Sequence, residues 1–107
     1  MTSKVRVTST HVAEPAPKRW SNCLRAGDFL YVSGLTSRGN DGVTIEGKGE
    51  YEQSKIIFTK MKNLLEAGGA KMDDVVKLTL FVTNIGNNKE VWKAREEFFT
   101  GDFPAAS

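Results

Sequence analysis

The hydrophobic period of this chain changes from two residues to about 3.6 residues and back again within a length of 107 residues. Apolar and polar residues alternate at 4–8 and at 75–82, which is typical of strands that bury one face. The segment at 51–67 instead has the stripe of an amphipathic helix. A chain of this length holds one hydrophobic core, so strands and helices must share a single domain, residues 1–107. The pattern therefore predicts an α+β fold.

Turn residues predict where the extended segments of the first half begin and end. The expected extended segments are 4–8, 20–26, 29–34 and 43–45, and the expected loops are 14–17 and 37–42. Gly27-Asp28 separates two of these segments, and a glycine in the first place of a two-residue loop suits a type II′ hairpin turn. The piece at 43–45 follows a polar turn cluster and is expected at a sheet edge.

The first helix is expected to run from Tyr51 to a left-handed stop at Gly68-Gly69. Its buried stripe is expected to consist of Ile57, Met61, Leu64 and Leu65. Met61 and Met72 are interpreted as packing residues. The lysines and glutamates expected to form a solvated, mutually compensating helix face are Lys55, Lys60, Lys62, Glu50, Glu52 and Glu66.

A second helix is expected near the end of the chain. Asn87 suits the N-cap, and Glu90 stands three residues further on, which is the spacing of a capping box. Its pattern continues through Val91 to Phe99, and the segment 101–104 contains the glycine and proline expected to end it.

The strand expected at 75–82 lies between the two helices and has two different faces. Its apolar face, on which a helix should pack, consists of Val76, Leu78, Leu80 and Val82. The other face carries Lys77, Thr79 and Phe81, which is too polar for a sealed core and too apolar for plain surface. Such a mixture is common where subunits meet, so the sequence predicts an oligomer. The residues alone leave dimer and trimer both open.

Composition excludes several classes of function. Fifteen basic and thirteen acidic residues are interleaved and give a formal net charge of +2, which disfavours nucleic acid as a partner. Long apolar runs and an amino-terminal apolar segment are both missing, so neither secretion nor membrane spanning is expected, and a cytoplasmic location is predicted. The sequence has no nucleotide-binding glycine motif and no Cys or His pair at metal spacing. We therefore expect no metal and no cofactor.

Two single residues with catalytic side chains are given structural interpretations. His11 is the only histidine and stands near a loop without the partners that a general base needs, so we expect it to be solvated. Cys23 is the only cysteine and lies in an expected strand, which favours a buried, inert thiol over a nucleophile.

Several short segments carry a resemblance to a known family. They are Arg25–Gly34, Glu66–Ala70, Asp74–Lys77 running into Phe81-Val82, Phe98-Phe99 and Phe103–Ala105. Together they resemble the RidA/YjgF family of reactive-intermediate enamine and imine deaminases, over the range from about Trp20 to Ser107. The resemblance implies two helices packed on one face of a mixed β-sheet, in a chorismate-mutase-like fold. It also implies a barrel-cored homotrimer with clefts between neighbouring subunits, and two further strands after Ser107, the last with a glutamate that helps to place water.

The resemblance implies a reaction as well as a fold. Active members hydrolyse unstable enamines or imines to keto acids and ammonia without a cofactor. Their arginine for the substrate carboxylate follows the Phe-Pro-Ala of the final loop, and this chain has Ala106 at that position. A lost charge-assisted contact is worth about 1.5–3 kcal/mol, so an altered substrate preference is expected.

The implied cleft differs from the family pattern at two more positions. Trp20 stands where the family has a cleft tyrosine, and Trp92 stands where it has an asparagine. Either tryptophan is consistent with packing in a core or interface, or with stacking on a ligand. The ligand-binding residues expected from the resemblance are Trp20, Ser33, Gly34, Trp92, Ala105, Ala106 and Ser107. Arg19 and Arg25 are candidates to replace the missing cation.

Three functions remain open at this point. The first is a RidA-like enzyme with altered preference, the second is a trimer that binds a small metabolite without catalysis, and the third is an endoribonuclease or translation inhibitor. The near-balanced charge makes the third the weakest of the three.

Overall fold

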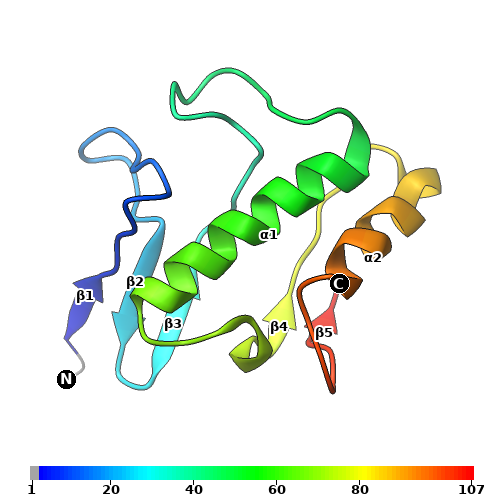
Figure 1. Ribbon diagram of the computed structural model, residues 1–107. Helices are drawn as coiled ribbons and strands as arrows, with labels where there is room; N and C mark the ends of the chain where they lie inside the picture. Colours follow the sequence, from blue (N-terminus) through cyan, green and yellow to red (C-terminus); the bar gives the residue numbers. More distant parts are fainter. Residues whose placement is uncertain (1–2) are drawn as a thin grey trace.

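The computed structural model describes residues 3–107 and has two layers, with both helices on the same side of the strands (Figure 1). The strands are β1 (Lys4–Arg6), β2 (Cys23–Ala26), β3 (Phe29–Val32), β4 (Lys77–Leu78) and β5 (Ala105–Ala106). The helices are α1 (Gly49–Ala67) and α2 (Asn88–Glu96), and two 3₁₀ turns are η1 (Met72–Asp74) and η2 (Ile85–Asn87). The predicted α+β class is confirmed.

The strands form two small sheets rather than the single mixed sheet that we expected. An antiparallel sheet has the order β1-β2-β3, and a parallel sheet consists of β4 and β5. In the part of the chain that the structure describes, no ladder joins β3 to β4. Figure 1 shows α1 over β2 and β3 and α2 near β4 and β5. Side chains of α1 pack in one core cluster with Leu30 and Val32 of β3 and with Leu78 of β4, which connects the two sheets.

The predicted hairpin is confirmed. β2 and β3 pair with Ala26 opposite Phe29, so that Gly27-Asp28 is a two-residue loop. Gly27 has a φ of 60°, whereas Asp28 has a negative φ, as a type II′ turn requires. The positive φ is the reason why a glycine stands at this position.

The piece at 43–45 is not a sheet edge, contrary to our expectation. It folds back on Arg38 through an isolated antiparallel bridge to Ile45. Asp41 fixes this local loop, because its carboxylate accepts hydrogen bonds from the backbone N–H groups of Val43 and Thr44, both at 2.9 Å. The Thr44 hydroxyl also donates to this carboxylate, at 2.6 Å. That hydrogen bond first, and the two backbone hydrogen bonds after it, hold the pKa of Asp41 down at about 2.

Helix α1 begins at Gly49, two residues before the predicted start, and ends as predicted before Gly68. Gly69 has a φ of 86°, the left-handed conformation expected of the stop. The largest fully buried side chain of α1 is Phe58, which is 1% exposed and was missing from the predicted stripe. Its ring packs on Phe98 at 5.5 Å and Phe99 at 5.9 Å between centroids, so contacts distant in sequence determine its burial.

Helix α2 is shorter than predicted and starts differently. Asn87 makes no side-chain cap hydrogen bond, because it belongs to the turn η2 and is not extended. The Asn84 side chain accepts from the backbone N–H of Gly86 at 3.0 Å instead. The helix ends at Glu96, and Phe99 lies beyond it, where it packs against the core.

In the predicted strand at 75–82, only the residues of β4 pair with another strand, β5. Leu78 is 6% exposed and Leu80 is partly buried, as predicted, but Val76 is 74% exposed. Val75 packs against the core in its place, since η1 turns the chain immediately before it. The predicted exposure of Phe81 on the other face is confirmed at 93%.

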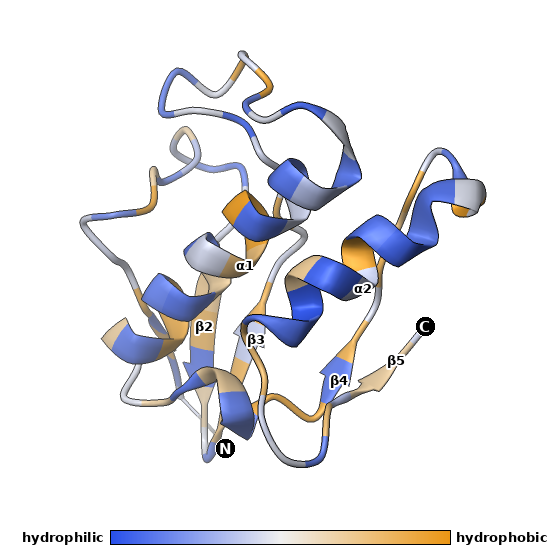
Figure 2. Ribbon diagram, turned by 45° about the vertical axis from the view of Figure 1, so that its right-hand side comes forward, coloured by the Kyte–Doolittle hydropathy of each residue, from blue (hydrophilic) through white to orange (hydrophobic). Residues whose placement is uncertain are grey.

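The core lies between α1, α2 and the strands, and it has two clusters bridged by Leu30 and Val32 of β3. Cys23 is fully buried, and Met72 is buried, as predicted. Colouring by hydropathy shows β2 and β3 as mostly apolar or neutral, whereas α2 is mostly hydrophilic (Figure 2). Helices long and apolar enough to cross a membrane are absent from residues 3–107.

Lys55, Lys62, Glu52 and Glu66 of α1 are exposed, as predicted, but within residues 3–107 no ion pair joins the lysines of this face to its glutamates. Lys60 donates hydrogen bonds to the carbonyl oxygens of Thr36 at 2.8 Å and Arg38 at 2.6 Å, so it fastens the 36–47 loop to the helix. Lys55 lies 3.6 Å from the carboxylate of Glu97, just after α2, and so connects the two helices. Both partners come from other parts of the chain, which helical spacing alone does not reveal.

Candidate functional site

A buried asparagine organises the end of the hairpin that carries the predicted site residues. Asn22 is 5% exposed and donates to the carbonyl oxygen of Ala13 at 2.9 Å and to the Glu14 carboxylate at 3.2 Å. Its backbone carbonyl accepts from the N–H of Ser33 at 2.9 Å. The residue was not predicted as functional, because an asparagine inside an extended segment has no distinctive spacing.

Ser33 and Gly34 directly follow β3. The Ser33 hydroxyl oxygen is buried and has no hydrogen-bond partner within residues 3–107. A buried hydroxyl without a partner costs about 1–3 kcal/mol, so this oxygen is available to a group that enters from outside. An added Cβ on Gly34 would meet nothing within 4 Å, which means that the backbone here is open to approach.

The two tryptophans are partly exposed. Trp20 is 55% exposed, and its indole Nε1 donates to the side-chain oxygen of Asn22 at 3.3 Å. The hydrogen bond orients the ring at the hairpin end and leaves much of its surface free. Trp92 lies on α2 and is 42% exposed. The exposed surface of each indole is available for stacking.

The final loop is held by backbone hydrogen bonds to the β4 segment. Ala105 and Ser107 donate to the carbonyl oxygens of Val76 at 3.1 Å and Leu78 at 3.0 Å. The Lys77 ammonium contacts the Ser107 hydroxyl, which places a cation one residue from Ala106. The sequence analysis assigned Lys77 only to the face expected at a subunit interface. Its proximity to Ser107 depends on the pairing of β4 with β5, which the sequence does not reveal.

Within the single chain these residues do not form a single pocket. Trp20 and Ser33 belong to the sheet of β1, β2 and β3, whereas the final loop belongs to the other sheet, and the two lie apart in Figure 1. Arg25, one candidate for the missing cation, donates to the carbonyl oxygen of Gly68 at the end of α1. Arg25 is therefore a helix-end ligand, while the other candidate, Arg19, is exposed.

An apolar hollow separates the two sheets, and we call it the interstrand groove. Its walls are residues 28–35 and 74–82, its floor is α1, and its volume is about 860 Å³. Ser33 and Gly34 line it, whereas the other predicted ligand-binding residues do not.

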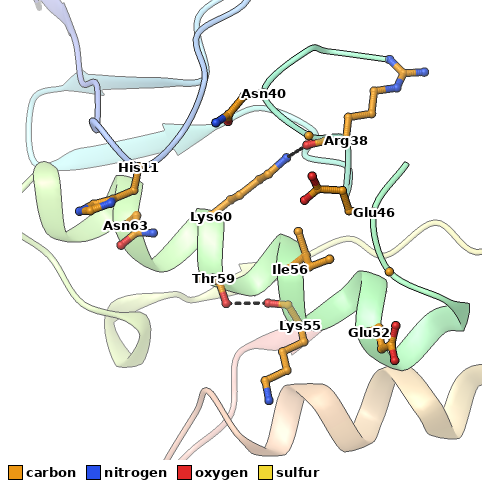
Figure 3. Close-up of a pocket in the computed structure, with 12 residues that line it drawn as sticks. His11, Arg38, Asn40, Glu46, Glu52, Lys55, Ile56, Thr59, Lys60 and Asn63 are labelled. Atoms are coloured by element: carbon orange, nitrogen blue, oxygen red, sulfur yellow. Dashed lines mark hydrogen bonds between the residues drawn. The ribbon is translucent and has the colours of Figure 1, made fainter. Parts of the chain in front are cut away.

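A second, polar hollow of about 670 Å³ lies between α1 and the 36–47 loop. His11 and Arg38 stand at opposite ends of it, and Lys60 is committed to the loop carbonyl groups (Figure 3). His11 is exposed, as predicted. Across the described residues, no group of three or more His, Cys, Asp or Glu side chains could hold a metal ion.

The titration of Cys23 agrees with an inert thiol. Burial raises its pKa, and the nearby Arg25 charge lowers it by less. The thiol therefore stays protonated at neutral pH and is not a nucleophile in the native state.

The chain is a small α+β protein with both helices on one side of two short sheets and with polar and aromatic groups at the strand ends. Comparisons with known proteins identify its family. Residues 11–107 match the model of the endoribonuclease L-PSP family. A 2-iminobutanoate/2-iminopropanoate deaminase from Dermatophagoides farinae is 36% identical over 98% of this chain and 82% of its own length.

Solved structures agree with this match. A protein of unknown function from Pseudomonas aeruginosa superposes with a TM-score of 0.87 at 30% identity, over 100% of this chain and 79% of that one. A putative endoribonuclease L-PSP from Entamoeba histolytica gives 0.85 at 28% identity, over 98% and 83%. The chain belongs to the endoribonuclease L-PSP family, and the RidA/YjgF resemblance seen in the sequence is confirmed.

Proposed function

We propose that this protein is a RidA-like enzyme that hydrolyses reactive enamines or imines to carbonyl compounds and ammonia. The observation that carries the proposal is the 36% identity, over 98% of this chain, to a relative named as a 2-iminobutanoate/2-iminopropanoate deaminase. An enamine first tautomerises to the imine, as a proton moves from nitrogen to carbon. Water then adds to the carbon of the C=N bond, a proton moves from the added oxygen to the nitrogen, and the carbon–nitrogen bond breaks to give the carbonyl compound and ammonia. The chemistry needs a held water and an oriented substrate, and no cofactor.

The chain offers groups for these tasks at two places. The partnerless Ser33 hydroxyl and the open backbone at Gly34 suit the holding of water or of the imine nitrogen. At the other place, Lys77 supplies a positive charge beside Ser107, where the missing arginine leaves Ala106. A lysine is a point charge without the planar fork of arginine, so a weaker hold on carboxylates and an altered substrate preference follow.

Because these two places lie apart in one subunit, we propose that the cleft forms between subunits of a homotrimer. Large apolar side chains on the helix-free face support association: Phe29 is 63% exposed, Tyr31 61% and Phe81 93%. In such an assembly the hairpin end of one copy would face the final loop of another. A cytoplasmic location is part of the same proposal.

The test is keto-acid release from 2-aminoacrylate that a dehydratase generates in the assay. We expect modest acceleration by the natural chain and a gain of about ten- to a hundredfold in kcat/KM for Ala106→Arg, since a charge-assisted contact is worth about 1.5–3 kcal/mol. Ala105→Arg is the matched control, because it adds the same charge one residue away. Release at the spontaneous rate by both the natural chain and Ala106→Arg would contradict the proposal.

A second candidate is a trimer that binds a metabolite without catalysis. The two partly exposed tryptophans and the alanine at 106 favour it. Stabilisation against heat by a keto acid or aromatic acid, without turnover by the natural chain, would select this candidate.

An endoribonuclease is favoured only by the family description. Failure to bind RNA even at low salt would dispose of it.

A further inference from the structure

The loop at 13–20 is connected to the rest of the molecule through very few side chains. Within residues 3–107, the hydrogen bonds that leave this loop end on the side chains of Asn22 and Arg6. The loop residues that contact the Asn22 side chain are Ala13, Glu14 and Trp20. Both ends of the loop are therefore joined to one another through a single amide group.

The pairing of β2 with β3 shows which way this amide points. Cys23 lies opposite Val32, and both side chains pack in the core under α1. The ladder continues one pair further, since the N–H of Ser33 donates to the carbonyl oxygen of Asn22. Side chains alternate between the two faces of a strand, so Asn22 and Ser33 point to the helix-free face. Asn22 is buried there under the loop that bonds to it.

Glu14 determines which way round the Asn22 amide stands. An amide nitrogen has two N–H donors, whereas the amide oxygen only accepts. The nitrogen donates to the Ala13 carbonyl at 2.9 Å and to the Glu14 carboxylate at 3.2 Å, and the oxygen accepts from the Trp20 indole at 3.3 Å. In the reversed amide the oxygen would face two acceptors and the nitrogen would face the indole N–H. The carboxylate opposes this reversal most, because a charge-assisted hydrogen bond is about twice as strong as a neutral one.

The Glu14 carboxylate is itself held in place. The Arg6 guanidinium lies 3.5 Å from its other oxygen. Val7, the next residue along the chain, is buried in the core, so Arg6 points to the helix-free face, where Glu14 meets it. A partly exposed ion pair adds little stability, but it restricts the rotamers of both side chains. Arg6, Glu14 and Asn22 thus form a line of polar contacts that ends on Trp20.

The ring at the end of this line has one fixed edge and a free surface. The indole N–H of Trp20 is bonded to Asn22, and the side chain is 55% exposed. A fixed aromatic face suits a flat, π-bonded group, which stacks on it or meets it edge to face. Lys18 and Arg19 directly precede Trp20 and are exposed, so the surroundings are positively charged and attract a carboxylate. The surface therefore suits a ligand with an aromatic ring and a carboxylate.

We propose that Glu14 is a positioning residue that acts through Asn22 to hold Trp20 as a flat binding wall, and that the preferred substrates are imines carrying an aromatic ring and a carboxylate, an assignment that rests on the proposed function and names its substrate class. A substrate without a ring cannot use this wall. Small imino acids therefore bind more weakly than aromatic ones, and the difference depends on Glu14.

Calorimetric titration with phenylpyruvate and pyruvate tests this assignment without turnover. These are the keto acids that the proposed reaction releases from the imines of phenylalanine and alanine. We expect the natural chain to prefer phenylpyruvate, and Glu14→Ala to reduce this preference by about two- to tenfold, the range of one aromatic contact. Glu14→Gln should keep the preference, since its amide oxygen still accepts from Asn22. Asp28→Ala is the matched control, because it removes an exposed carboxylate from the other end of the hairpin.

Fluorescence reports on the ring directly. In a Trp92→Phe background Trp20 is the only tryptophan, and acrylamide should quench it faster after Glu14→Ala but not after Glu14→Gln or Asp28→Ala. Equal quenching in Glu14→Ala, no preference for phenylpyruvate, or a preference that survives Glu14→Ala would overturn the assignment. Loss of affinity for both keto acids alike would also overturn it, because a general loss of structure would then be the cause. Preferred binding of phenylpyruvate without turnover of either imine would contradict the proposed reaction but support the role of Glu14.

Discussion

Asn22 holds three separate parts of the chain together through one buried side chain. Its amide contacts the Ala13 carbonyl, the Glu14 carboxylate and the Trp20 indole, and its backbone holds Ser33. The position of Trp20 beside the hairpin therefore depends on a residue that sequence reasoning did not select. The contribution of a single residue to the fold therefore depends more on its burial and hydrogen bonds than on its residue type.

We predict that Asn22→Ala destabilises the fold by about 1–3 kcal/mol, because the Ala13 carbonyl loses its partner in a partly buried setting. Urea denaturation followed by tryptophan fluorescence measures this change, and Trp20 should also become more mobile. Asn40→Ala is the matched control, since Asn40 is exposed, and it should change stability by less than about 0.5 kcal/mol. Equal effects of the two substitutions would show that the Asn22 contacts do not stabilise the native state.

Contacts between elements connect the turn after α1 with the end of α2. The Asp73 carboxylate of η1 accepts hydrogen bonds from the backbone N–H of Thr100, at 2.8 Å, and from its hydroxyl group. These hydrogen bonds hold the pKa of Asp73 below its ordinary value of 3.8. Asp73 lies in the short 3₁₀ element η1 and Thr100 lies beyond α2, so the contact follows from the packing of α1 and α2 and not from a local pattern.

The pH dependence of stability should reveal this contact. A carboxyl group whose pKa is lowered by folding stabilises the native state above its unfolded pKa of about 3.9, and this stabilisation is lost as pH falls through the lower folded pKa. We therefore expect Asp73→Asn to be less stable than the natural chain at pH 6, with the difference shrinking toward pH 2. Denaturant unfolding at several pH values measures it. Asp102→Asn is a control, because Asp102 is an exposed neighbour, and a difference that is constant with pH would refute the assignment.

The whole molecule has one side covered by helices and one side without them. The helix-free side carries exposed aromatic rings on both sides of the interstrand groove, with Phe29 and Tyr31 at 6.5 Å between ring centroids on one side and Phe81 on the other. These rings give a broad surface, which suits contact with another protein chain better than it suits a small ligand.

We predict that the natural chain has about three times the mass of a single chain in light scattering, and that Phe81→Lys shifts it toward the monomer. A charge in the middle of an apolar contact loses its hydration without gaining a partner, which disfavours association. Val43→Lys is the matched control: Val43 is 76% exposed, but it lies in the 36–47 loop away from this face. A monomeric natural chain, or equal masses for the natural chain and Phe81→Lys, would contradict the trimer with this interface.

The sequence by itself determined the elements that depend on neighbouring residues. Alternation and turn residues placed β1 to β4 inside longer expected segments, helical periodicity placed α1 and the start of α2 within two residues, and Gly27 fixed the hairpin turn, because each signal arises from contacts close in sequence. β5 was not predicted, because it depends on pairing with β4. The family also followed from short segments of sequence. The burial of Phe58, the attachment of Lys60 to the 36–47 loop, the Lys77 contact with Ser107 and the separation of β3 from β4 came only from the tertiary structure. Their partners lie far away in sequence, and no local pattern encodes which distant segments meet.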